Sequence, residues 1–318
     1  MDGIFAPAFS ATLVAVAKVF LVMAGAGALV RARILRDEHI TAMTAVTVNV
    51  LLPCLIFSNI VRTFDPFSFP FWWALPLAAG LMIGLGLGLG VLIYRRRLPE
   101  KRSLLALCGI HNSGYLILPI GQALFPEQFD LFANYTFLYL LGAGPLLWSL
   151  GKALVTSGGE GGIDWKGLAN PPLIANVVAI LTVFCGGHVH IPALLLDPLD
   201  MLGRAAVPIG NLILGAVLGG ISLRLGPYIS DALKTILVKL VLVPAATILA
   251  LAALDVRAAF PLMAAFLVLE SAAAPATGLI LQVRHYGGDE ERVSSLMMIS
   301  YLACLMLMPL WIAVWNIL

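Results

Sequence analysis

Charged residues are scarce in this sequence. Asp, Glu, Lys and Arg make up 11% of the 318 residues, whereas hydrophobic residues make up 61%. Soluble domains carry about a quarter charged and about half apolar residues, so this chain has too little polar surface to cover a water-soluble core. The composition therefore excludes a soluble enzyme, a secreted disulfide-linked domain and a disordered segment, and it indicates a membrane protein.

Motifs for catalysis, metal binding and nucleotide binding are also missing. The four cysteines lie in apolar stretches without CxxC spacing, which is typical of packing residues. There is no GxxxxGK loop for ATP and no HExxH motif for a zinc protease. A net charge of +2 gives no argument for nucleic-acid binding. We therefore predict neither an enzyme nor a nucleic-acid-binding protein, and no resident cofactor or metal.

What the chain does contain is a series of long apolar segments. A membrane-spanning helix needs about 20 mainly apolar residues. Segments of this kind cover residues 8–30, 39–61, 70–94, 103–124, 130–151, 170–187, 199–220, 229–254, 258–282 and 292–317. The sequence therefore predicts an all-α polytopic membrane protein with ten transmembrane helices.

The spacing of prolines indicates an internal repeat. Pro53 and Pro119 are 66 residues apart, and Pro208 and Pro275 are 67 residues apart. Because each half would hold an odd number of helices, the second half would enter the membrane from the opposite side. Many secondary transporters are built from such inverted repeats. We therefore expect two inverted five-helix repeats.

The repeats are predicted at residues 1–156 and 170–318, joined by a glycine-rich linker at 157–169. Loops on the linker side carry fourteen lysines and arginines, and the opposite loops carry three, Arg62, Arg204 and Arg257. By the positive-inside rule, the linker and the basic loops face the cytoplasm. Both termini would lie outside, in a multi-pass protein of the inner or plasma membrane.

Polar residues and prolines interrupt the fourth and the ninth predicted helices. Unpaired backbone at such a break is tolerated only where protein or a water-filled cavity satisfies it, and half-helix ends there can bind anions and cations. We therefore expect a substrate site at these breaks. The candidate residues are Asn112, Ser113, Tyr115, Pro119, Ser271 and Pro275. Two proline kinks filled by neighbouring helices are the alternative.

Glu270 in the ninth predicted helix is the strongest single candidate. A carboxylate at mid-bilayer costs about 2.5–3.5 kcal/mol, so it is expected to be protonated, paired or bound to an ion. Lys18 and Lys239 are the other charges deep inside predicted helices, away from the helix ends. We predict an ion- or proton-handling role for Glu270, and a structural pair with Lys239 is the alternative.

Several motifs occur in a specific order along the chain. They are NVLLPCLIFSNI at 49–60, HNSGYLILPIG at 111–121, NPPLIANVVAIL at 170–181, the segment 272–295 and the closing MPLWIAVW. With these motifs the chain resembles the auxin efflux carrier family. That family includes plant PIN auxin exporters and bacterial carriers of malonate-like acids, within the superfamily of the bile acid sodium symporters.

The resemblance implies a dimeric carrier with an elevator mechanism. Helices 1, 2, 6 and 7 would form the scaffold and the dimer contact, and helices 3–5 and 8–10 would form the moving transport domain. It also implies that Asn112 hydrogen-bonds a substrate carboxylate. Asn49, at the start of the first motif, completes the predicted substrate-binding set.

We therefore predict a secondary active transporter of small organic anions, such as malonate-like dicarboxylates or auxin-like acids. In the bile acid relatives a glutamate near the crossover helps to bind sodium. Glu270, with Asn112 and Ser113, is thus the predicted site for a coupling Na+ or H+. An uncoupled uniporter or a channel for organic anions is the alternative. The expected partners are the substrate anion, the lipid bilayer and a second copy of the chain.

Overall fold

The computed structural model describes residues 2–156, 169–221 and 226–318, and most of the predicted linker lies outside these ranges. Within them, the regular secondary structure is helical apart from one isolated antiparallel bridge. Seven helical segments are long and apolar enough to cross a membrane: Phe5–Arg31, Asp37–Thr63, Ala74–Arg97, Pro126–Val155, Ala193–Gly219, Gly226–Ala253 and Glu290–Ile317. The protein is therefore a polytopic membrane protein.

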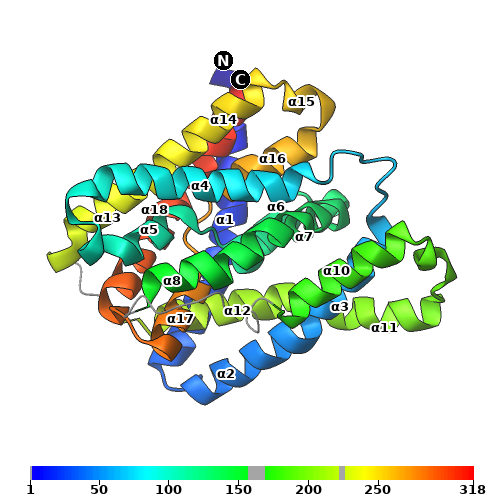
Figure 1. Cartoon of the computed structure of the whole chain (residues 1–318), viewed down its shortest axis with the longest axis horizontal. Helices are drawn as coiled ribbons and strands as arrows, with labels where there is room; N and C mark the ends of the chain where they lie inside the picture. The colour runs from blue at the N-terminus through cyan, green and yellow to red at the C-terminus, as the bar shows by residue number, and fades with distance from the viewer. Residues whose placement is uncertain (1, 157–168, 222–225) are drawn as a thin grey trace.

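The described part of the first half, residues 2–156, contains eight α-helices (Figure 1). They are α1 (Asp2–Arg31), α2 (Asp37–Val46), α3 (Leu52–Thr63), α4 (Ala74–Tyr94), α5 (Arg102–Gly109), α6 (Leu118–Leu124), α7 (Phe129–Leu146) and α8 (Lys152–Val155). The second half contains α10 (Pro171–Phe184), α11 (Ala193–Arg204), α12 (Ala206–Gly219), α13 (Ile229–Ile236), α14 (Val243–Ala253), α15 (Val256–Ala259), α16 (Pro261–Ser271), α17 (Gly278–Tyr286) and α18 (Glu290–Ile317).

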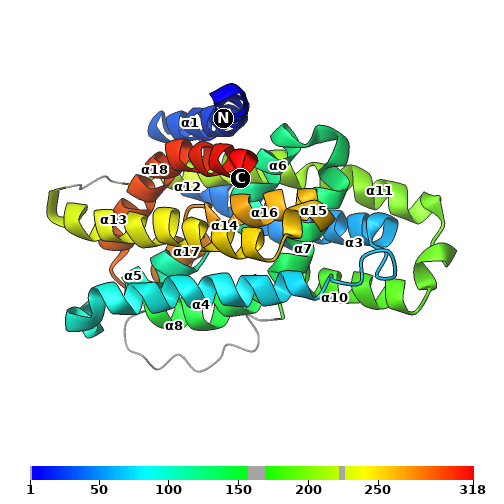
Figure 2. The same ribbon diagram turned by 90° about the horizontal axis from the view of Figure 1, so that it is seen from above.

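Helices from the two halves pack against each other. The first helix, α1, packs along α12 and α18, whereas α3 packs along α10 and α11. Figure 2 shows α1 at one edge of the molecule and α4 at the opposite edge, with α14, α16 and α17 between them. The two polar residues at the end of α16, Glu270 and Ser271, are fully buried.

The contact between α1 and α12 is made by backbone. A Cβ built on Gly219 would lie 2.2 Å from the Cα of Gly27, and one built on Gly215 would lie 2.3 Å from the carbonyl oxygen of Met23. Small residues of this kind let two membrane helices approach closely, which gives dispersion contacts where no hydrophobic force acts between helices in lipid.

Four stretches of the described chain are π-helical. They are Thr47–Leu51, Ser113–Ile117, Leu147–Gly151 and Leu237–Leu242. Three of them run directly into an α-helix that has a proline in its first turn, at Pro53, Pro119 and Pro244. A proline ring clashes with the carbonyl four residues before it, and a wider turn relieves that clash.

Two helical segments are interrupted and meet at their interruptions. The chain leaves the helix at residues 110–112, between α5 and the π-turn at Ser113, and again at 272–277, between α16 and α17. The Asn112 amide donates to the carbonyl of Ala274 over 3.0 Å, and the Ala276 amide donates to the carbonyl of Ile110 over 3.3 Å. The first interruption therefore does not lie at Pro119 itself but ends seven residues before it, at Asn112. Pro119 lies in the first turn of α6, where a proline is tolerated.

The α1–α12 contact gives a stability prediction. Gly219→Ala should push the two helices apart, because the new methyl group meets backbone that cannot rotate away, and overpacking of this kind costs about 1–3 kcal/mol. The melting temperature of the purified protein in detergent, followed by intrinsic fluorescence, measures this loss.

Gly25→Ala is the matched control, because a Cβ on Gly25 meets nothing within 4 Å. Equal melting temperatures for the two variants would contradict the close backbone contact.

Candidate functional site

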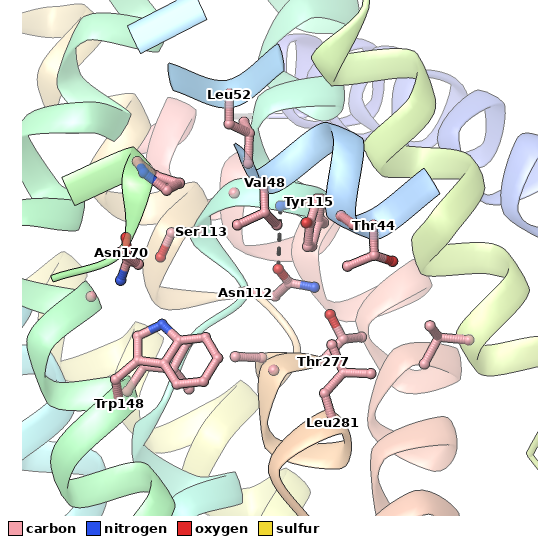
Figure 3. Close-up of a pocket in the computed structure, with 18 of the residues that line it drawn as sticks. Thr44, Val48, Leu52, Asn112, Ser113, Tyr115, Trp148, Asn170, Thr277 and Leu281 are labelled. Atoms are coloured by element: carbon pink, nitrogen blue, oxygen red, sulfur yellow. Dashed lines mark hydrogen bonds between the residues drawn. The ribbon is translucent and has the colours of Figure 1, made fainter. Parts of the chain in front are cut away.

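A cavity of about 980 Å³ lies beside the crossing of the two interruptions. One wall comes from the crossing itself, through residues 111–115 and 276–278, and the opposite wall comes from α2, its π-helical continuation and α12. In Figure 3, Thr44, Val48 and Leu52 face Asn112 and Thr277 across this space, and Trp148 lies to one side. The cavity therefore lies between the polar crossing on one side and α2, its π-helical continuation and α12 on the other.

The side chain of Asn112 is held in one orientation at the cavity wall. Its Nδ2 donates to the hydroxyl of Tyr301 over 2.5 Å, and its Oδ1 accepts from the backbone amide of Tyr115 over 3.3 Å. The Tyr301 hydroxyl in turn donates to the carbonyl of Pro275 over 3.1 Å. Because an amide nitrogen carries two hydrogens, one N–H of Asn112 remains for a further acceptor.

Ser113 connects the cavity to a buried carboxylate. Ser113 lines the cavity, and its hydroxyl donates to Oε1 of Glu270 over 2.5 Å. Glu270 lies in the last turn of α16, is fully buried and does not line the cavity. Its second oxygen, Oε2, has no hydrogen-bond partner within the part of the chain that the structure describes.

The remaining predicted residues fall into two groups. Tyr115 and Asn49 line the cavity, with the ring of Tyr115 against Gly210 of α12 and the Asn49 amide donating to the carbonyl of Ala45. Pro119, Ser271 and Pro275 do not line it. Ser271 donates to the carbonyl of Val268, and Pro275 contributes its carbonyl to Tyr301.

The structure adds residues to the site that sequence reasoning did not select. Tyr301 lies in an apolar stretch of α18, and nothing in its local sequence predicts a contact with Asn112. His111 opens the motif at 111–121, but its sequence does not predict its contact: Nδ1 lies 2.9 Å from the carbonyl oxygen of Glu270. Trp148 belongs to a π-turn, and Pro145 just before it is the only feature of the local sequence that indicates an irregular helix there.

The mouth of the cavity is charged. Asp37, Arg284, His285 and Glu290 lie at the ends of helices there, and Arg284 pairs with Glu290 at 2.6 Å. These residues adjoin the loops that carry most of the lysines and arginines. The interior of the cavity, in contrast, is lined by His111, by amides and hydroxyls, and by apolar groups.

A family comparison covers nearly the whole chain. Residues 11–155 and 162–312 match the family described as "Membrane transport protein". The chain belongs to this family, the auxin efflux carrier family. It is a transporter protein and not an enzyme. The chain is also 26% identical over 200 residues to an uncharacterized transporter of Methanocaldococcus jannaschii, a match that covers 61% of this chain and 65% of that relative.

Membership of the auxin efflux carrier family places the crossing in context. A transporter must expose a binding site to water while keeping it inside the bilayer. The cavity at the crossing extends to exposed charged residues at its mouth, and the paired backbone at residues 110–112 and 274–276 satisfies groups that a plain helix break would leave open.

Tyr301→Phe tests the link between the two interruptions. The change removes the hydrogen bond that Tyr301 donates to Pro275 and the one it accepts from Asn112, and leaves a buried carbonyl without this donor. We expect a loss of about 1–3 kcal/mol in stability. Thermal unfolding in detergent measures it.

Tyr135→Phe serves as the comparison, since Tyr135 is also buried and contacts Phe69 and Phe266 through its ring. A Tyr301 variant as stable as this control would show that the hydroxyl does not tie the interruptions together.

Proposed function

We propose that this auxin efflux carrier family member is a secondary active transporter of small organic anions, with carboxylates such as malonate-like or auxin-like acids as substrates. The observation that carries this proposal is the oriented amide of Asn112 at the cavity wall, with one N–H left for an acceptor. A carboxylate oxygen is such an acceptor, and a fixed donor costs little entropy on binding.

A second feature supports an anionic substrate. Helix α17 begins at Gly278, and Ala276, Thr277 and Gly278 line the cavity beside Asn112. The amides of Leu279 and Ile280 already bond to the carbonyls of Ala276 and Thr277. In the described structure the amides of Thr277 and Gly278 have no such backbone partner, and the helix dipole places partial positive charge there. A carboxylate between Asn112 and the start of α17 would meet donors from both interrupted segments.

The packing supports two inverted repeats with the predicted boundaries, 1–156 and 170–318. The first helix of the first repeat, α1, packs along α12 in the second repeat, and the first helix of the second repeat, α10, packs along α3 in the first. An inverted repeat requires such reciprocal contacts.

An elevator movement is the mechanism that we favour. The scaffold would comprise α1, α2–α3, α10 and α11–α12, and the moving domain would comprise α4–α8 and α13–α18. The cavity lies between these two groups, so sliding of the moving domain would carry the crossing across the membrane. As the resemblance implies, the scaffold would also form the contact of a homodimer.

The cavity mouth supports an inward-open state. It lies at Asp37, Arg284 and Glu290, on the side of the basic loops. With those loops in the cytoplasm, as the positive-inside rule predicts, both termini lie outside and the substrate site opens inward.

Asn112→Ala should abolish carboxylate binding while the protein stays folded. The measurement is the rise in melting temperature on adding acetate, malonate or indole-3-acetate to the purified protein. Asn316→Ala is the control, because Asn316 lies at the far end of α18 and bonds to Ile312 within its own helix. Carboxylate stabilisation that survives in Asn112→Ala would exclude this site.

Counterflow in proteoliposomes separates a carrier from an anion channel. A carrier preloaded with unlabelled carboxylate should take up labelled carboxylate faster than empty vesicles do, because the loaded site returns more readily. A channel or an uncoupled pore gives no such acceleration. Uptake that is insensitive to preloading would therefore favour the channel alternative.

Glu270→Gln should retain counterflow but lose the dependence of net uptake on an H+ or Na+ gradient, because the amide cannot gain or lose the coupling charge. Net uptake under imposed gradients measures the change. Gradient-driven uptake equal to that of the wild type would rule out coupling at Glu270.

A further inference from the structure

A second cavity, of about 320 Å³, lies between α1, α12 and α18. Its walls come from one face of α1, from residues 215–219 at the end of α12 and from residues 298–302 of α18. Among the described residues that line it, Arg31 is the one charged residue, and all the others except Tyr301 are apolar. A ligand of this cavity must therefore be almost entirely apolar.

The cavity is a groove that runs along α1. The α1 residues that line it follow the spacing i, i+3, i+4, i+7, i+8 and i+11, which places them on one face of the helix: Phe20, Met23, Ala24, Gly27, Ala28 and Arg31. Phe20 and Arg31 are eleven residues apart, so the groove extends about 16 Å along the helix axis. The hydrocarbon core of a bilayer is about 30 Å thick. The groove thus has the depth of a single leaflet.

The groove is closed toward the protein and open toward the membrane. Met23 and Tyr301 are buried, whereas Ala24 and Ala28, which also line the groove, are exposed. The lipid-facing side of α1, around the exposed Val22, lies on the other face of the helix and lines no part of the groove. A lipid chain can therefore enter the groove sideways from the bilayer.

Arg31 gives one end of the groove a positive charge. It lies in the last turn of α1, is exposed, and forms no ion pair with another described residue. Arg33 follows two residues later and is also exposed. A guanidinium group binds phosphate through two parallel hydrogen bonds, and basic pockets between transmembrane helices bind anionic head groups. The groove thus combines an apolar channel with a phosphate-binding group at the membrane surface.

We propose that this groove binds an acyl chain of an anionic phospholipid whose phosphate lies at Arg31. The chain extends from the head-group level toward Phe20, and dispersion contacts with three helices hold it there. The volume is at the lower end of the range for ligand pockets, about 300–1,000 Å³, which suits one chain and not a whole lipid. The groove shares no lining residue with the larger cavity, so this phospholipid is a bound partner and not the transported substrate.

Tyr301 connects the groove to the crossing of the two interruptions. Its ring lies 6.5 Å from the ring of Phe20, measured between centroids, and both residues line the groove. Its hydroxyl bonds to Asn112 and to the carbonyl of Pro275. A chain in the groove therefore packs against the residue that ties the two interruptions together.

The head-group assignment predicts a preference for negative charge. Dioleoylphosphatidylglycerol should bind the wild type about fivefold more tightly than dioleoylphosphatidylcholine, which has the same chains and no net charge, because one arginine at the membrane surface contributes about this factor. Arg31→Gln should remove the preference. Arg96→Gln should keep it and is the matched control, because Arg96 is an exposed arginine just after α4, at the opposite edge of the molecule (Figure 2).

The chain assignment predicts that a larger side chain in the groove blocks binding. Ala24→Phe should lower the affinity for the first phospholipid to that of the later, nonspecific ones. Val22→Phe is the matched control, because it adds the same ring on the other face of α1 and should leave the affinity unchanged. Ala28→Phe, one turn farther along the groove, replaces Ala24→Phe if that variant does not fold.

Native mass spectrometry of the protein in detergent measures the affinity for the first phospholipid and the oligomeric state together. Equal wild-type affinity for the two phospholipids, or an unchanged preference in Arg31→Gln, would overturn the head-group assignment. Unchanged affinity in the phenylalanine variants would exclude the chain from the groove. A wild-type dimer that Ala24→Phe separates into monomers would show that a second copy fills the groove, and binding of glycerol 3-phosphate alone would show a site for free phosphate.

Discussion

The pairing of two interrupted segments by their own backbones is the constraint on which the site depends. Amides and carbonyls at residues 110–112 and 274–276 satisfy one another across the crossing. Without that pairing, each interruption would leave polar backbone inside apolar surroundings, at several kcal/mol per group in lipid. Because the pairing holds the two segments together, it brings Ser113 to Glu270. It also brings Asn112 next to Pro275, where the hydroxyl of Tyr301 bonds to both residues.

The π-helical turns explain how irregular backbone and candidate site residues coincide. Asn49, Ser113, Trp148 and Lys239 each lie on one of the four described π-turns. A π-turn inserts one residue into a helix, so it turns side chains away from the face that regular periodicity would give them and frees carbonyls. One such carbonyl, that of Leu240, accepts a hydrogen bond from Trp311.

Much of this arrangement follows from the sequence. Composition alone predicted a polytopic helical membrane protein, and polar clusters beside prolines located both interruptions to within a few residues. The sequence placed the first interruption at Pro119, whereas in the structure the helix ends earlier and the interruption begins at Ile110. The π-turn before α6 accommodates the ring of Pro119. The contacts of Tyr301 and the complete burial of Lys239 could not be predicted, since they depend on which faces of α18 and of the π-turn after α13 point inward. The inverted repeats and the elevator domains stay predictions.

The glycine contact between α1 and α12 has a consequence for how this protein can diverge. Where side chains separate two helices, a larger residue on one can be offset by a smaller residue on the other. At Gly27, Gly215 and Gly219 the neighbours are backbone atoms, so no such compensating change is available. Sequence drift along this contact is therefore confined to residues of glycine size, while the lipid-facing side of α1 can vary freely in shape.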